Sequence, residues 1–541
     1  MSFKPKPPRP MAKELAVLGP KLLRPDSPSR LVGEQVYEQY DEADYVDLYH
    51  AEGKPAISPV LLSFVTAFQY MENLSDREAA EAVRMRLDWK YALHLPLDYA
   101  GFNFSVLSEF RYRVIEHQAE ARLFDCLLEQ RQGLGLIKQR GRQRTDSLAV
   151  LTRVRDLNRL ELVVETLRLA VRALLAVDPV WTRATVPPTW EERYGERCVA
   201  SQLSKEERKT LESEVGQDGQ WLLGRLQAET TPAVLRELPE VQTLSTVWSQ
   251  QCEVIEGKVV YQAPEPYDGT TRVQTPHDPE ARYSKKGKQS WVGDKLQVTE
   301  TDDEGYPHLI TDIAMTSSVE TDAVALEGIQ ARLEARDLLP EEQLGDAAYI
   351  SGPNLARSQE RGIDLIGPVP EGQSPPARMP DGCTQDQFRV DWEANVAICP
   401  AGQMSNKGIQ HSSGGTQFRF RKAACQTCPL RSRCCSGTGG RTITISPYHD
   451  LLQAARARQE TEDFKVVYRQ HRGGVEGCLS ALVRGHGMRK KRYIGQAKGH
   501  LQALFTGATV NLRRSASWLA GKRPQIRHQG LGLTTVGSIA S

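Results

Sequence analysis

The order of strands and helices in residues 286–369 is the feature that most restricts the fold. The stretch begins with two predicted strands joined by a turn, and a helix that Pro340 stops follows them. A short strand ending at Asp346, a helix capped by Ser351 and a buried strand come next. With a further strand predicted near residues 144–152, this order is typical of a mixed α/β fold.

Helical patterns dominate residues 31–138, where two helix starts are marked. Pro59 stands at the first position of one helix, and Ser75 with Glu78 three residues later forms a capping box at another. Short helices that carry basic residues are typical of a helix-turn-helix-like DNA-binding module. A small helical bundle without a role in DNA binding fits the same pattern, so both interpretations stay open.

The charge of the chain is unevenly distributed. Its net charge is +1, yet the last 78 residues carry fourteen basic groups and one acid, Glu476. Like charges on one helix repel each other unless an anion neutralises them, so this segment is predicted to bind a polyanion. The residues expected to contact a DNA backbone are Arg469, Arg472, Arg484, Arg489, Lys490, Lys491, Arg492 and Lys498.

Three acids stand where metal chemistry would need them. Asp146 lies in a predicted strand, Asp346 at the end of another, and Glu476 in a late helix. Converging carboxylates bind Mg²⁺ or Mn²⁺, and two such ions can activate the attacking oxygen and stabilise the leaving oxygen of a phosphodiester. Asp278, just before the strand pair, is the alternative to Asp146 as first acid; as a structural residue it would mark an Asp-Pro turn.

The residues around these acids resemble the motifs of bacterial insertion-sequence DDE transposases. The matching segments are "RTDS" at 144–147, "LGDAAYIS" at 344–351 and "RGGVEG" at 472–477. Longer stretches, among them "HDPEARYSKKGKQSWVGDKLQVTETDDEGYPHLIT", "ACQTCPLRSRC" and "GMRKKRYIGQAKGHLQALFTGATVNLRR", are similar to the insertion sequence eleven-eighty-two group. The N-terminal helices resemble the InsH-type domain of these transposases.

The resemblance implies an RNase H-like catalytic domain, a mixed sheet flanked by helices. It implies that Asp146, Asp346 and Glu476 are catalytic and hold two Mg²⁺ (or Mn²⁺) ions. Tyr468, Arg472, Glu476 and Arg484 approximate the tyrosine–arginine–glutamate–lysine signature of related enzymes. The implied reaction is hydrolysis at the ends of the element and transfer of the freed 3′-OH into target DNA.

The implied partners are double-stranded DNA, as transposon ends and as target, and a second copy of the chain in a synaptic homodimer. The resemblance also implies a bacterial, nucleoid-associated protein. No apolar run approaches the roughly 18 residues of a membrane span, so we expect it to be cytoplasmic. Two other functions stay open: a domesticated transposase that binds DNA without cutting it, and an RNase H-like nuclease that cuts without joining.

The chain is accordingly divided into eight segments. They are a disordered arm (1–30), a helical N-terminal DNA-binding domain (31–138), the first catalytic strand (139–155), a helical insertion (156–285), the RNase H-like core (286–369), an irregular, strand-poor, Cys-containing insertion (370–447), the C-terminal helices of the catalytic core (448–525) and a disordered tail (526–541).

Four cysteines in the Cys-containing insertion have spacings that suit a metal. Cys399, Cys425, Cys428 and Cys434 form the pattern C-x₂₅-C-x₂-C-x₅-C, and Cys435 competes for the last position. A tetrahedral Zn²⁺ site would stiffen an insertion that has little apolar core. The alternative is a set of reduced cysteines that pack in a small β-rich insertion.

Overall fold

The computed structural model describes residues 1–154, 157–262, 271–370, 376, 379, 381–412, 414–435 and 437–523. The chain divides into two compact units, each built from separate stretches of sequence. Unit 1 comprises Met1–Lys138, Thr301–Ile310 and Gly507–Ser541, and unit 2 comprises Gln139–Glu300 and Thr311–Thr506. The predicted tail, residues 526–541, lies outside the described residues.

Unit 1 is helical, and its helices begin where the sequence signals place them. Pro59 is the first residue of α3, and the Ser58 hydroxyl accepts the Leu61 N–H at 3.2 Å. Ser75 and Glu78 form the predicted capping box at the start of α4. The helices are α1 (Lys13–Leu22), α2 (Pro28–Leu31), α3 (Pro59–Glu72), α4 (Asp76–Met85), α5 (Leu87–Ala92), α6 (Ser105–Glu116) and α7 (Arg122–Gly133).

Residues 1–30 differ from the disordered arm that the sequence suggests. They contain α1, in which Leu15 is completely buried. The backbone carbonyl of Arg9 forms a hydrogen bond of 2.9 Å with the His94 ring. Apolar packing and this polar contact therefore order a stretch whose prolines and lysines indicated an arm.

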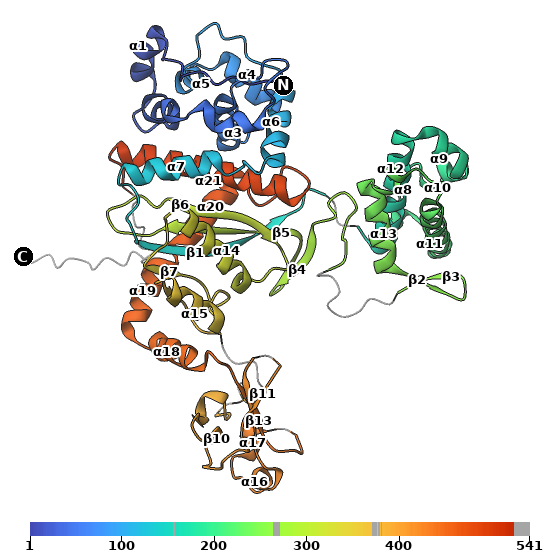
Figure 1. The fold of residues 1–541 in the computed structure, drawn as a ribbon, viewed down its shortest axis with the longest axis vertical. Helices are drawn as coiled ribbons and strands as arrows, with labels where there is room; N and C mark the ends of the chain where they lie inside the picture. Colours follow the sequence, from blue (N-terminus) through green and yellow to red (C-terminus); the bar gives the residue numbers. More distant parts are fainter. Residues whose placement is uncertain are drawn as a thin grey trace, which may run out of the picture. The chain divides into compact units, whose positions relative to one another are not determined.

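Unit 2 contains a six-stranded mixed sheet, as expected for a mixed α/β fold (Figure 1). Its strands are β1 (Arg142–Leu151), β4 (Arg282–Lys286), β5 (Gln289–Thr301), β6 (Ile310–Ser317), β7 (Glu342–Leu344) and β8 (Asp364–Ile366). The order is β4-β5-β1-β7-β8, β6 also pairs with β5, and β1, β7 and β8 are parallel. The helices after the sheet strands are α14 (Asp322–Ala335), α15 (Gly352–Glu360), α18 (His449–Gln459), α19 (Glu462–Arg472), α20 (Gly474–His486) and α21 (Gln496–Leu519), whose residues from Gly507 on belong to unit 1.

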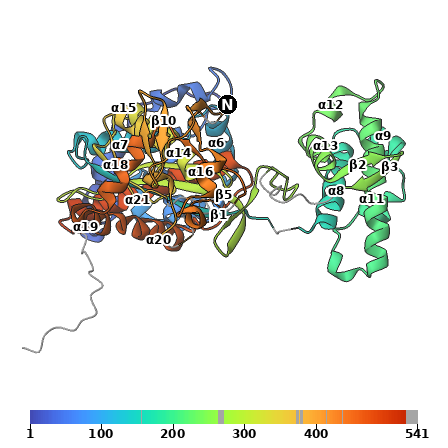
Figure 2. The ribbon, with the colours of Figure 1, turned by 90° about the horizontal axis from the view of Figure 1, so that it is seen from below.

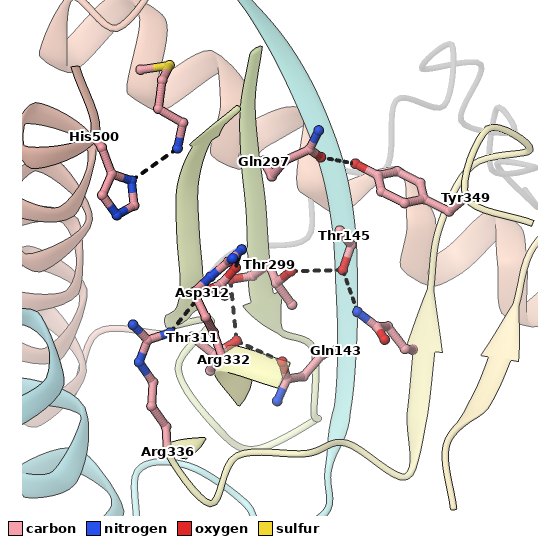
Figure 3. A network of polar contacts seen from close by, with 12 residues as sticks. Gln143, Thr145, Gln297, Thr299, Thr311, Asp312, Arg332, Arg336, Tyr349 and His500 are labelled. Atoms are coloured by element: carbon pink, nitrogen blue, oxygen red, sulfur yellow. Dashed lines mark hydrogen bonds and ion pairs between the residues drawn. The ribbon is translucent and has the colours of Figure 1, made fainter. Parts of the chain in front are cut away.

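Buried polar side chains connect the strands of this sheet (Figure 3). The Thr145 hydroxyl lies 2.9 Å from the Thr299 hydroxyl and also accepts a hydrogen bond from Gln343 at 2.9 Å. The Thr311 hydroxyl donates to Gln143 at 2.7 Å. Since unpaired polar groups are costly in a protein interior, these bonds favour one arrangement of the strands.

The helical insertion has a hydrophobic core of its own. Figure 2 shows its helices gathered together. Trp248 is 2% exposed, and its indole N–H donates to the Gly216 carbonyl at 3.0 Å. The elements are α8 (Arg159–Val177), α9 (Pro179–Thr185), α10 (Trp190–Tyr194), α11 (Lys205–Gln227), α12 (Ala233–Arg236), α13 (Pro239–Gln251) and the hairpin of β2 (Cys252–Ile255) and β3 (Lys258–Tyr261).

The Cys-containing insertion is built on short strands, so the prediction of a strand-poor region is wrong. Phe418, Phe420, Ile443 and Ile445 alternate with more exposed residues and form its core. This alternation stabilises strands. The elements are β9 (Arg389–Asp391), β10 (Val396–Ile398), β11 (Ile409–Gln410), β12 (Thr416–Arg419), β13 (Thr442–Ile445), α16 (Lys422–Gln426) and α17 (Arg431–Cys434).

Among the described residues, no helix combines the length and the apolar character that a bilayer crossing requires.

Candidate active site

The parallel pairing of β1 with β7 brings two of the three predicted acids to one level of the sheet. Its register places Arg144 opposite Leu344, so two residues further along Asp146 comes level with Asp346. Neighbouring strands lie about 4.8 Å apart. The charge of Asp346 acts on the Asp146 carboxyl and raises its pKa, which agrees with this proximity.

Asp146 is buried, with 7% of its surface exposed. One carboxyl oxygen accepts the Ser147 N–H at 2.7 Å, and the other pairs with the Arg472 guanidinium at 2.8 Å. Burial raises the pKa of Asp146, and Arg472 opposes that rise. Arg472 therefore acts as the counter-cation of the first acid.

Asp346 is partly buried at the carboxyl end of β7, and its Oδ1 accepts the Ala348 N–H at 2.9 Å. The same charges act on Tyr468 of α19. Burial raises the pKa of its phenol, Arg472 lowers it, and Asp346 and Asp146 raise it. The site thus contains two carboxylates, one guanidinium and one phenol.

Glu476 lies in the first turn of α20, and its side chain is exposed. It follows Arg472 by four residues, and Gly473 between them keeps helical angles (φ −62°, ψ −23°), so both side chains leave the same side of the chain. Yet no three His, Cys, Asp or Glu side chains within the described ranges are placed to hold one metal ion. The structure therefore brings Asp146 and Asp346 together and leaves Glu476 outside that pair.

The chemistry of the paired acids fits a divalent cation of the Mg²⁺ type. Carboxylate oxygens are the ligands that such hard ions prefer. The Arg472 Nε atom is buried without a hydrogen-bond partner, so the guanidinium is incompletely satisfied beside Asp146. A cation that took over the neutralisation of Asp146 would release Arg472 for another anion.

Arg144 fixes the junction of α19 and α20 against β1, a role that sequence reasoning missed. Its guanidinium donates to the Glu300 carboxylate at 2.8 Å and to the His471 carbonyl at 3.0 Å. A Cβ atom on Gly474 would lie 1.9 Å from Arg144 Nη1, so a larger residue there would displace the guanidinium from its present contacts. A charged residue inside the strand predicted near residues 144–152 was the signal in the sequence.

The segment after α20 pairs with the other end of β1. The Leu151 N–H donates to the Arg489 carbonyl at 2.9 Å, and the Lys491 N–H donates to the Leu151 carbonyl at 3.0 Å. The chain segments just before and just after the helix that carries Glu476 are therefore both hydrogen-bonded to β1.

Five of the eight predicted DNA-contacting residues are exposed: Arg469, Arg484, Arg489, Lys490 and Lys498. Arg492 is partly buried, and Arg472 pairs with Asp146. The prediction that Lys491 contacts DNA is wrong. Its side chain is buried (2% exposed), and its ammonium lies 2.6 Å from Asp294 and 2.9 Å from Asp278. Two buried carboxylates hold Lys491 inside the protein, away from any DNA backbone.

The same ion cluster bears on Asp278, the alternative first acid. Asp278 has no exposed surface, and its carboxylate accepts the Thr152 hydroxyl at 2.5 Å and the Gly495 N–H at 3.2 Å. Burial opposes the charged form of Lys491, but Asp294 and Asp278 outweigh that effect and raise its pKa. Asp278 is thus neutralised within the interior, and Asp146 is the better-placed first acid.

The five clustered cysteines line one cavity of about 20 Å³: Cys399, Cys425, Cys428, Cys434 and Cys435. The Cys399 and Cys425 sulfurs each accept a backbone N–H at 3.4 Å, from Gln403 and Arg441. Burial raises the pKa of Cys434 to about 12. The described thiols, like the acids, include no three that are placed around one ion.

Two families match the chain. The "Transposase DDE domain" family matches residues 398–516, which include Glu476, and the "Transposase domain (DUF772)" family matches residues 20–113. No curated protein and no solved structure is similar enough to count as a match.

Proposed function

Since this chain is a DDE transposase of the bacterial insertion-sequence kind, we propose that it binds the terminal inverted repeats of its own element, cleaves the DNA there and joins the freed 3′-OH ends to target DNA. The observation that carries this proposal is the pair formed by Asp146 in β1 and Asp346 just after the adjacent parallel strand β7, beside the α19–α20 region that supplies Arg472 and Glu476. The mixed sheet flanked by helices supports an RNase H-like core.

In this proposal, Asp146, Asp346 and Glu476 hold Mg²⁺ or Mn²⁺, with Glu476 joining the other two acids when DNA and metal are bound. The ions supply Lewis-acid activation of the attacking oxygen and stabilisation of the leaving oxygen. Arg472, displaced from Asp146, then contacts a phosphate of the substrate.

The remaining contacts follow from exposure and charge. We propose that Arg469, Arg484, Arg489, Lys490, Arg492 and Lys498 hold the phosphate backbone of the transposon end. The helices of residues 31–138 are proposed to bind DNA as well, and two chains to form the synaptic complex.

A strand-transfer assay tests the proposal. Purified protein is incubated with Mg²⁺, a duplex that ends in the element's inverted repeat, and a supercoiled target plasmid. We expect joined products, loss of cleavage in Glu476→Gln with end binding retained, and normal activity in the control Glu462→Gln, an exposed acid on α19.

The other outcomes identify the alternatives. Hydrolysis without joining supports a nuclease, and DNA binding without cleavage by the wild-type chain supports a domesticated protein. Cleavage that survives Glu476→Gln contradicts the assignment of the third acid.

We also propose a structural Zn²⁺ held by Cys399, Cys425, Cys428 and Cys434. Their shared cavity supports it, and the thiols would have to move closer to share the ion. Metal analysis of protein purified without added zinc tests this. One zinc per chain is expected, with loss in Cys428→Ser, and a zinc-free, fully folded wild-type protein contradicts it.

A further inference from the structure

The Cys-containing insertion contains a second stretch with one sign of charge. Residues 394–449 include no aspartate or glutamate and seven basic residues. These are Lys407, Arg419, Arg421, Lys422, Arg431, Arg433 and Arg441. They lie outside the basic C-terminal segment, so they form a separate region of positive charge.

The strand pattern turns part of this charge outward. Phe418 and Phe420 are buried in the core of the insertion, whereas the intervening Arg419 and the following Arg421 are exposed. Successive residues of an extended chain point to opposite sides, so the two arginines share one side. Lys422 begins α16 directly after them, and Arg433 projects from α17; both are exposed.

These cations lack acidic partners. In the described part of the chain, none of Arg419, Arg421, Lys422 and Arg433 forms an ion pair. Two arginines of the next helix, α18, differ: Arg456 pairs with Asp386 and Arg458 with Asp364, each at 2.6 Å. Uncompensated like charges repel, and that repulsion is relieved when a polyanion binds.

We propose that Arg419, Arg421, Lys422 and Arg433 form a second DNA-backbone contact surface, distinct from that of the C-terminal helices. Its ligand is the phosphate backbone of double-stranded DNA, bound without regard to base sequence. The proposal rests on the proposed function and adds the insertion to the parts of the chain that hold the substrate.

The test compares two fourfold variants of the full-length chain. The first carries Arg419→Gln, Arg421→Gln, Lys422→Gln and Arg433→Gln. The control carries Arg172→Gln, Arg183→Gln, Lys205→Gln and Lys209→Gln, which removes four exposed cations from the helical insertion. Binding to a duplex of about 30 base pairs of arbitrary sequence is measured by anisotropy without added Mg²⁺ or Mn²⁺, over a salt series. Thermal unfolding checks that both variants are folded.

The expected result is at least a tenfold loss of affinity in the first variant. The slope of log K against log[salt] should fall by roughly 0.9 for each lost phosphate contact, about 2–4 in all, while the control matches the wild type. An unchanged slope in the first variant, or an equal loss in both, overturns this inference alone. A wild-type chain that binds no duplex counts against the proposed function itself.

Discussion

Lys491 shows how the position of a single residue decides the role of its charge. It lies within a run of four basic residues, yet it alone is enclosed by Asp278 and Asp294. Lys491→Met should lower the free energy of unfolding by about 3–5 kcal/mol, because two buried carboxylates lose their cation. Urea unfolding measures the loss.

The neighbouring Lys490→Met is the matched control, since Lys490 is exposed, and its effect on stability should be small. Asp294→Asn should cost less than Lys491→Met, because a balanced pair of Asp278 and Lys491 survives. Equal stability of Lys491→Met and Lys490→Met would contradict the buried position of Lys491.

His500 gives the chain a defined response to acid. Its Nδ1 atom accepts the Met315 N–H at 3.2 Å, and burial lowers the pKa of His500 to about 4 (Figure 3). Between pH 6.5 and 4 the His500 ring takes up a proton in the unfolded chain but not in the folded chain. The free energy of unfolding therefore falls by about 3 kcal/mol as the pH is lowered through this range.

Urea unfolding of the wild type and His500→Gln at pH 7, 5.5 and 4 measures this effect. The variant should lose less stability on acidification. The difference between the two proteins at pH 7 gives the effect of the changed packing alone. Parallel pH profiles of the two proteins would show that His500 does not cause the loss.

Single residues also mark the limit of prediction from sequence. Asp146 and Asp346 were identified from motifs, and the parallel register then accounts for their meeting. The inward turn of Lys491 was not predictable, because its partners Asp278 and Asp294 lie about 200 positions earlier in the chain. A local charge pattern contains no information on which member of the run meets a distant acid.

At the scale of elements, the start of α20 depends on a close approach. Gly474→Ala would push the Arg144 guanidinium away from Glu300 and the His471 carbonyl. We expect a loss of about 1–3 kcal/mol of stability, as for other overpacked sites, together with reduced DNA cleavage.

Gly477→Ala is the control, because nothing lies within 4 Å of a Cβ atom there. Alanine should stabilise the helix at this position by about 0.5–1 kcal/mol. Chemical denaturation compares the two variants, and a Gly474→Ala chain as stable as Gly477→Ala would contradict the described packing.

Elements were predictable where their signals are local. The strand predicted near 144–152 corresponds to β1, and the Ser75 capping box marks α4. The strands of the Cys-containing insertion were missed because they have two to four residues each, so their alternation is too brief to stand out in the sequence. The position of Glu476 relative to Asp146 depends on packing between distant segments, which no local pattern encodes.

At the scale of the whole molecule, unit 1 is assembled from separate stretches. Within it, Arg131 on α7 donates to the Ser515 hydroxyl at 3.0 Å, and Arg513 donates to the Met71 carbonyl at 3.0 Å. A fragment of residues 1–138 lacks these partners and the buried Leu512. We expect it to unfold without a sharp transition in a circular dichroism melt.

The helical insertion provides the comparison, because its core comes almost entirely from residues 157–262. That fragment should melt cooperatively. Cooperative melting of residues 1–138 at the temperature of the full chain would show that the C-terminal stretch is dispensable for unit 1.

The register between β1 and β7 also sets a time order for synthesis. Arg142 and Glu342 pair across 200 positions in the sequence. Asp146 can therefore come level with Asp346 only after the ribosome has made most of the chain. Contacts this distant in sequence form slowly, whereas local helical bodies form early. Glu476 emerges last of the three. A nascent or prematurely terminated chain can therefore carry folded helices long before it carries all three acids. Under the proposed function, such an unfinished product could not cut the DNA that encodes it.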